Sequence, residues 1–332
     1  MIIKDLILNV AILFIMMIPG FVLRKCKLSS DGFGKGLSNL VLYIAQPVLI
    51  FSAYIRAFDK TVLINSLYIL VMSAVAHTVF AVVALSLFRK APDMKRRMLR
   101  FATIFSNAAF MGIPLISSVL GAEATIYASV YNIVFNLFLW SLGVKICVSD
   151  RDLDGDGDSD ADDKKIAKTK SRSAIKLALL HPVTIAALLG LIVFLLPIDG
   201  YISSVKLVMD SLDMIKNLVA PLSMTVIGLR LADINFRGFF TDKHMYLALV
   251  LRHLALPLIV VAIVRLLALA GLGNDGITSM VIVIMAATPA ASSATMFAEK
   301  YDCDAAYVSK FVAFSTVISI LTMPLVLLVA GL

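Results

Sequence analysis

Ten mostly apolar stretches follow one another along the chain, separated by short polar segments. A helix needs roughly 20 such residues to cross about 30 Å of hydrocarbon, whereas a membrane barrel strand needs only about 10 alternating ones. The lengths therefore predict membrane-spanning helices over residues 5–23, 37–55, 62–88, 98–120, 123–147, 175–196, 207–231, 244–270, 276–298 and 304–330.

Composition agrees with this reading. Hydrophobic residues make up 60% of the 332 residues and charged residues 16%, against about 45–50% and 25% in an ordinary soluble domain. A soluble enzyme, a secreted disulfide scaffold and a disordered chain are excluded. Cys26, Cys147 and Cys303 are scattered and form no ligand pair, and no cleavable signal peptide is evident. We expect no cofactor.

The net charge of +8 is explained by the bilayer rather than by a nucleic-acid partner. Lysine and arginine gather in the odd-numbered loops between the predicted spans and are few in the even-numbered loops and at the two ends. The positive-inside rule therefore predicts cytoplasmic odd-numbered loops and both termini outside a cell membrane.

The chain also repeats itself at an offset of 174–175 residues. The matching positions are prolines, arginines and one histidine–arginine pair: Pro47 with Pro221, Arg56 with Arg230, Pro114 with Pro289, and His77 with Arg252. We infer a repeat of 1–148 in 175–332, with 149–174 as a cytoplasmic acidic and basic linker. Since each half holds five spans, the halves enter the membrane in opposite senses, as in many secondary transporters.

Spans four and nine carry repeat-related interruptions. Gly112 and Pro114 disfavour helix in the fourth span, and Pro289 does so in the ninth. We expect an unwound segment at each place, because irregular backbone at that depth is tolerated when it is buried in protein or lines a cavity. Two kinked helices packed through small residues are the alternative.

Crossed half-helices would direct their positive N-terminal ends at one point, which suits an anion. No aspartate or glutamate lies at the centre of any predicted span, which also favours an anion over a cation. The candidate substrate-binding residues surround the two interruptions: Asn107, Gly112, Ile113, Pro114, Thr288, Pro289, Ala290, Ser292, Ser293 and Thr295.

The stretches Ser106–Leu115, Ala220–Ser223 with Ile227–Leu229, and Thr288–Pro289 with Phe314–Thr316 resemble the auxin efflux carrier family. The resemblance covers nearly the whole chain. It implies ten helices in a five-plus-five inverted repeat with crossed broken helices 4 and 9, related to bile-acid symporters and NhaA-type antiporters. It further implies a scaffold of spans 1, 2, 6 and 7, a mobile transport bundle of spans 3–5 and 8–10, and frequently a homodimer.

By motif match, the family places Asn107 and Pro114 at the first crossing and Pro289 at the second. Pro47 and Pro221 would face the site from the scaffold wall. Bacterial-type relatives are expected to carry dicarboxylates such as malate. Plant exporters have a carboxylate in the third span where this chain has His77, so a proton-carrying role is not carried over.

Five further polar residues in apolar context are second-tier candidates for a cavity or for coupling: Gln46, His77, Asn132, Asn136 and Lys310. His77 can carry a proton or be a neutral packing residue. Lys310 can contact substrate or extend to the cytoplasmic interface. Asn132 and Asn136 share a helical face, where they line the cavity or bond to neighbouring helices.

An acidic run in the fifth loop spaces oxygen ligands as a calcium loop does, with glycine at the sixth position. Its twelfth position is aspartate rather than glutamate, and a solvated linker is the alternative. The calcium-loop candidates are Asp152, Asp154, Asp156, Asp160 and Asp163.

Together these features predict an exporter of a small organic anion, a carboxylate, that works by elevator-type alternating access. A sodium- or proton-coupled symporter is one alternative, and an anion channel or membrane sensor is another. No motif of an intramembrane enzyme appears in the sequence.

Overall fold

The computed structural model describes residues 2–30, 32–148, 176, 179–196, 198–233, 242–272, 276–301 and 303–331. Within these ranges every regular element is a helix, as expected of this fold class. The α-helices are α1 (Ile2–Ile15), α2 (Ile18–Lys25), α3 (Phe33–Leu40), α4 (Gln46–Ala53), α5 (Lys60–Ser86), α6 (Asp93–Ile104), α7 (Ile113–Phe138), α8 (Val144–Cys147), α10 (Pro182–Leu195), α11 (Asp199–Ser204), α12 (Lys206–Lys216), α13 (Val219–Ala232), α14 (Lys243–Val250), α15 (Leu256–Leu269), α16 (Gly276–Ala287), α17 (Ser293–Lys300) and α18 (Ala305–Ala330).

Seven helical stretches of the described chain are long and apolar enough to cross a bilayer, and two shorter apolar helices accompany them. The longest, Ala108–Cys147, joins parts of the predicted fourth and fifth spans. Gly121 divides it, because its φ of +80° is a conformation that favours glycine. Each predicted span range therefore contains helix, although α10 and α16 are shorter than predicted.

π-helical turns precede three of the prolines that lie inside the helical stretches. The turns η1 (Val41–Ala45), η2 (Ala108–Gly112) and η6 (Leu251–Ala255) end two residues before Pro47, Pro114 and Pro257. Because proline has no amide hydrogen and clashes with the preceding turn, the hydrogen-bond ladder widens there instead of breaking. A fourth π-turn, η3 (Leu139–Gly143), has no following proline in the same position.

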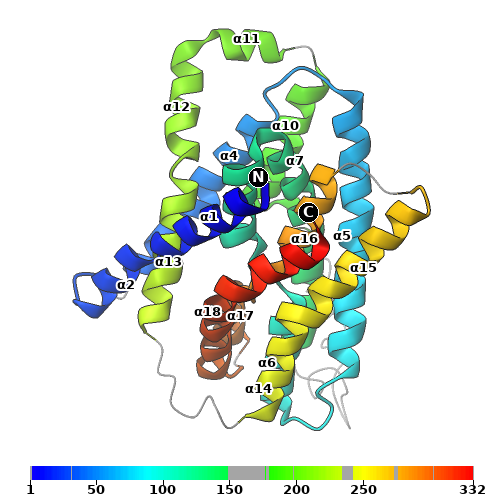
Figure 1. Cartoon of the computed structure of the whole chain (residues 1–332). Coiled ribbons are helices and arrows are strands. Elements are labelled where there is room, and N and C mark those ends of the chain that lie inside the picture. The colour runs from blue at the N-terminus through cyan, green and yellow to red at the C-terminus, as the bar shows by residue number, and fades with distance from the viewer. Residues whose placement is uncertain are drawn as a thin grey trace, which may run out of the picture.

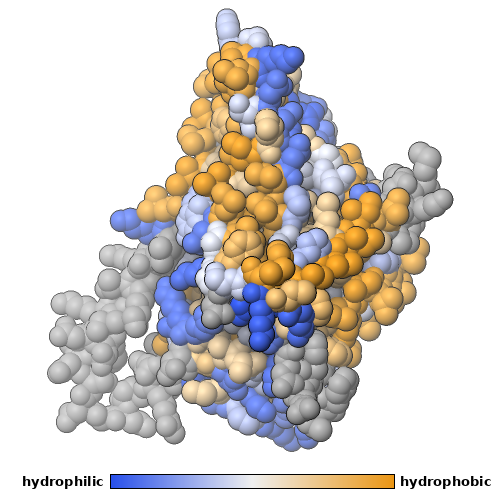
Figure 2. Space-filling view, turned by 90° about the vertical axis from the view of Figure 1, so that its left-hand side faces the viewer, coloured by the Kyte–Doolittle hydropathy of each residue, from blue (hydrophilic) through white to orange (hydrophobic). Residues whose placement is uncertain are grey.

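The outer surface of the helices is apolar, as a lipid-facing surface must be. On α5, Leu67, Val71 and Val82 are more than half exposed, while Ile69 and Phe80 on the same helix are fully buried. Figure 2 shows hydrophobic side chains over much of the visible face. Large apolar patches of this extent are not found on ordinary soluble monomers, and they indicate contact with a bilayer.

Two glycines let α2 and α13 pack with their backbones in contact. A Cβ atom on Gly20 would meet the main chain of Thr225, and one on Gly228 would meet the main chain of Met17. Figure 1 shows α2 and α13 together at one side of the molecule, with α11 and α12 at the upper end and α6 and α14 reaching the lower end. Small residues at such crossings are typical of membrane helices.

Candidate functional site

The two interrupted helices meet in the interior of the protein. The first interruption runs from the end of α6 at Ile104 to the start of η2 at Ala108, and the second from α16 to Ser293. The amide of Asn107 donates to the carbonyl oxygen of Pro289 at 2.7 Å, and the amide of Ala291 donates to that of Phe105 at 2.9 Å. The two interruptions are thus joined by a short antiparallel bridge.

The first interruption lies earlier in the chain than the sequence suggested. We expected Gly112 and Pro114 to be unwound, but Gly112 ends the turn η2 and Pro114 is in the first turn of α7. The physical reason is that proline near the start of a helix needs no amide partner, and the π-turn absorbs the missing bond. The non-helical residues are instead Phe105–Asn107.

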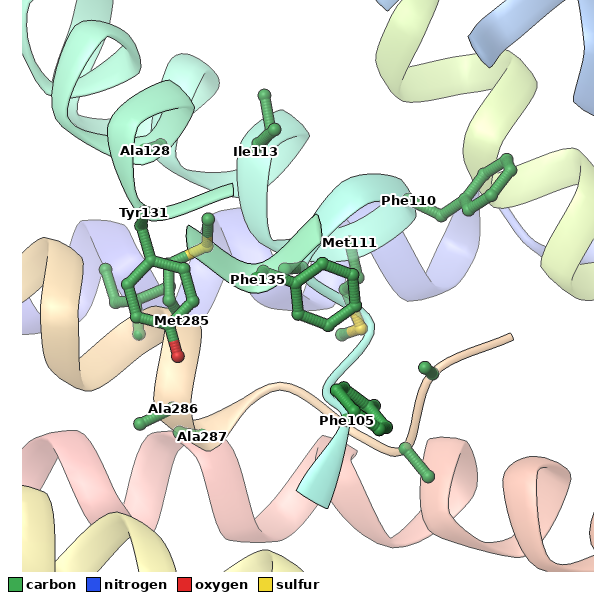
Figure 3. Packing of buried hydrophobic residues seen from close by; sticks show 14 of the residues in the cluster. Phe105, Phe110, Met111, Ile113, Ala128, Tyr131, Phe135, Met285, Ala286 and Ala287 are labelled. Atoms are coloured by element: carbon green, nitrogen blue, oxygen red, sulfur yellow. The ribbon is translucent and has the colours of Figure 1, made fainter. Parts of the chain in front are cut away.

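Close packing surrounds this bridge (Figure 3). Phe105, Met111 and Met285 are fully buried, and Phe135 is nearly so. A Cβ atom on Gly112 would lie 2.5 Å from the sulfur of Met285 and 3.5 Å from the methyl of Thr288. Any larger residue would force the buried Met285 side chain to move where η2 passes the end of α16.

The candidate residues of the second interruption each have defined partners. The Thr288 hydroxyl donates to the carbonyl oxygen of Met285 at 2.9 Å, and the amide of Ala290 donates to the Ser315 hydroxyl at 2.8 Å. The carbonyl oxygen of Ser292 accepts a hydrogen bond from Arg230 at 2.7 Å. These contacts fix the backbone between α16 and α17 against α13 and α18.

Further along α17, Ser293 and Thr295 are half-buried. The Thr295 hydroxyl lies 3.1 Å from the Ser309 hydroxyl of α18. Ile113 is fully buried at the start of α7, and Asn107 is 3% exposed. The side-chain nitrogen of Asn107 is buried and has no hydrogen-bond partner in the described part of the chain.

Two of the second-tier candidates, Gln46 and His77, are buried and bond to backbone carbonyl groups. Gln46 donates to the carbonyl oxygen of Ala109 at 2.8 Å and so joins α4 to the first crossing segment. His77 is fully buried, with Nδ1 2.7 Å from the Ser73 carbonyl oxygen and its ring 5.1 Å from that of Tyr131. Its other ring nitrogen has no partner among the described residues.

Asn132 and Asn136 are buried on α7 and keep one side-chain atom each without a partner in the described ranges. Lys310 is half-buried near the start of α18. Pro47 and Pro221 are half-buried on α4 and α13, and other residues of these two helices help to line a cavity.

That cavity has a volume of about 280 Å³ and lies between α4, α7 and the junction of α12 with α13. Pro114 is the member of the candidate set that lines it. The polar lining consists of one ammonium group, one amide and four hydroxyls, namely Lys216, Asn217, Ser52, Ser117, Ser118 and Thr125. Acidic side chains are absent from the described lining, although Asp213 lies 2.5 Å from the Lys216 nitrogen.

Sequence reasoning did not select Lys216 or Asn217 as site residues. The helical spacing of charges on α12 suggests an exposed amphipathic helix, and α12 indeed has no buried residue. Lys216 reaches the cavity because it ends this helix beside α4 and α7. The only signal in the sequence is its position five residues before Pro221, a proline 174 residues after Pro47.

No group of three or more potential metal ligands occurs in the part of the chain that the structure describes. The candidate calcium ligands from Asp152 to Asp163, together with the predicted linker 149–174, lie outside the described residues.

Comparison with known proteins assigns the family. Residues 5–327 match the family described as membrane transport protein. The chain is also 27% identical over 325 residues to an "Uncharacterized transporter" of Methanothermobacter thermautotrophicus, an alignment that covers 97% of this chain and 96% of that protein. This is a family of transporters rather than of enzymes, and the helices are those of a multi-pass membrane protein. The chain therefore belongs to the membrane transport protein family, the auxin efflux carrier family that its motifs resemble.

Proposed function

We propose that the protein is a carrier that exports a small organic anion, a carboxylate. The observation that carries this proposal is the cavity of about 280 Å³, whose lining combines the Lys216 ammonium group and the Asn217 amide with four hydroxyls. Its size is near the lower end of ordinary ligand pockets. A carboxylate satisfies these donors, because each of its oxygens accepts more than one hydrogen bond.

The electrostatics of the cavity favour one negative charge. Lys216 is about one-third exposed and is already paired with Asp213, which is about half exposed. An incoming carboxylate competes with Asp213 for the ammonium group. Because the Asp213 side chain is about half exposed, its release from Lys216 does not leave a fully buried charge unpaired.

The proposed architecture is ten crossings in an inverted repeat of 1–148 and 175–332. In it α1–α4, α10, α12 and α13 form the scaffold, and the remaining long helices form the transport bundle. Two repeat-related arginines support this division. Arg56, which follows α4, pairs with Glu123 of α7 at 3.1 Å, and Arg230 of α13 bonds the Ser292 carbonyl oxygen, so each links a scaffold segment to the bundle.

In this proposal the bundle moves as a unit past the scaffold, and the cavity between them changes sides. Both termini face outward, and the odd-numbered loops face the cytoplasm. Export of one negative charge is favoured by about 2.3 kcal/mol per 100 mV of membrane potential, so the potential alone can drive it.

Counterflow in reconstituted vesicles tests the proposal. Vesicles loaded with an unlabelled mono- or dicarboxylate should accumulate the same labelled compound transiently and with saturation. An imposed potential should change the rate of net flux. Asn217→Ala, which removes the amide from the cavity lining, should reduce counterflow, and Gly36→Ala, which alters an open position on α3, should leave it unchanged.

Three outcomes would replace the proposal. A flux of more than about a thousand ions per second through one molecule would identify a pore. Flux that requires a sodium or proton gradient would identify a symporter. Absence of counterflow for all tested carboxylates, with folded protein in the vesicles, would remove the substrate class.

A further inference from the structure

Four backbone carbonyl groups converge on one side chain beside the crossing. They belong to the C-terminal ends of the two interrupted helices, where the last carbonyl groups have no partner within the helix. Arg252 donates from Nη1 to the oxygens of Thr103 at 3.2 Å and Ile104 at 3.4 Å. It also donates from Nε to Thr288 at 3.2 Å and from Nη2 to Ala286.

This guanidinium group is a permanently charged cation in the interior of the protein. Arg252 is 0% exposed, and none of the salt bridges among the described residues includes it. Its carbon atom lies 5.4 Å from the centre of the Phe80 ring, an additional favourable contact for a cation. The charge is therefore balanced by dipoles rather than by a carboxylate.

The dipoles of α6 and α16 are sufficient for that balance. The C-terminal end of a helix carries a partial charge equivalent to about −0.5 elementary charge. Two such ends meet at Arg252, so their sum is about −1 and offsets one positive charge. The π-turn η6 contains Arg252 and shifts the helical register ahead of Pro257, which aims the side chain at both ends.

Unwound carbonyl groups and half-helix C-terminal ends are also the ligands with which transporters of this general architecture bind a coupling cation. We propose that Arg252 occupies such a cation site with its own side chain, so that the carrier binds and moves its anion without sodium. This inference rests on the proposed function for its transport consequence, but the occupancy of the site is a separate, measurable property.

Replacing the arginine should expose the latent site. In purified protein, Arg252→Ala should lower the melting temperature Tm in choline chloride, and equimolar sodium chloride should restore part of the loss, by about 2 °C or more. The wild type and Arg252→Lys should show the same Tm in both salts, because a charged group still meets the carbonyl oxygens.

Arg265→Ala is the matched control. Arg265 lies on α15, the helix that continues η6, and donates to the carbonyl oxygen of Ala330 at the end of α18. Its removal takes away a guanidinium group from one helix end rather than from two that meet. It should lower Tm without producing a response to sodium.

A folded Arg252→Ala protein that shows no difference between the two salts would overturn the proposal. If that variant does not fold, the wild type provides the test. Replacing sodium by choline on both sides of the vesicle membrane should change its initial counterflow rate by less than twofold. A tenfold loss of rate would overturn the proposal. Failure of counterflow in every salt would instead count against the proposed function, since the Tm comparison needs no transported anion.

Discussion

The amide of Asn107 and the carbonyl oxygen of Pro289 form a hydrogen bond of 2.7 Å between the two interrupted helices. With the reciprocal bond from Ala291 to Phe105, it pairs backbone groups that would otherwise be unsatisfied at membrane depth. Each bond contributes about 1 kcal/mol net. Since these amides are used in pairing, they are not free to bind an anion, and the unpartnered side-chain nitrogen of Asn107 is itself buried.

The passage of η2 over the end of α16 depends on Gly112. We predict that Gly112→Ala lowers the free energy of unfolding by about 1–3 kcal/mol, because the added methyl would overlap the Met285 sulfur in a buried position. The melting temperature and the rate of vesicle counterflow should both decrease. Gly36→Ala is the control, since no atom lies within 4 Å of its added methyl. Equal behaviour of the two variants would contradict the prediction.

A larger loss is expected at the crossing of α2 with α13. In Gly228→Ala, the added methyl would overlap the carbonyl oxygen of Met17, and main chain cannot rotate away as a side chain can. We predict a loss of about 3 kcal/mol, near the upper end for overpacking. Thermal unfolding measures it. Gly34→Ala is the comparison at the neighbouring α3, where the nearest atom is the Leu229 methyl at 3.7 Å; a smaller loss for Gly228→Ala than for Gly34→Ala would refute this packing account.

The helical character of the apolar stretches and the presence of two interruptions were predictable because their causes are local. Apolar length defines a candidate span, and Pro114 and Pro289, which are 175 residues apart, mark the neighbourhood of the two interruptions. The position of the first interruption was predicted wrongly, since proline allows either an unwound segment or a new helix start. Here the π-turn η2 decided between them.

Contacts between segments far apart in the chain could not be predicted from the sequence in the same way. The sequence shows Arg252 only as the match of His77, and nothing in its neighbourhood indicates that it meets carbonyl groups of both α6 and α16. Likewise, the amphipathic spacing of α12 conceals that Lys216 ends beside a cavity formed by α4 and α7. Both contacts depend on how separate segments pack, which periodicity does not encode.

Asp242 should make stability depend on pH. It lies before α14, outside the spans, where it accepts hydrogen bonds from the His244 amide at 3.0 Å, the Tyr307 hydroxyl at 3.0 Å and Lys95 at 3.3 Å. Burial alone would raise the pKa of its carboxyl group, but these bonds outweigh burial and hold the pKa below its ordinary value. The stabilisation is therefore present above the unfolded pKa of about 3.9 and is lost as pH falls through the folded pKa.

We predict that Asp242→Asn lowers the free energy of unfolding by about 1 kcal/mol at pH 7, because charge-assisted bonds become neutral ones while the helix cap is kept. The difference from wild type should shrink as pH falls below about 5 and disappear only below the folded pKa, which lies under the unfolded value of about 3.9. Thermal unfolding across this range measures it, with Asp242→Ala as the variant that also loses the cap. A difference that stays constant with pH would show that the charge is not responsible.

Lys216 should determine affinity for the transported anion. If a substrate carboxylate accepts a hydrogen bond from its ammonium group, Lys216→Gln should raise the half-saturation concentration about 10- to 100-fold, which corresponds to a charged hydrogen bond of about 1.5–3 kcal/mol. Asp213→Asn should act in the opposite direction, because it removes the carboxylate that competes for Lys216 at 2.5 Å. Lys206→Gln, at the other end of α12, is the control for a general charge effect. Saturable counterflow provides the measurement, and increased half-saturation in Asp213→Asn or an equal effect of the two lysine variants would refute the assignment.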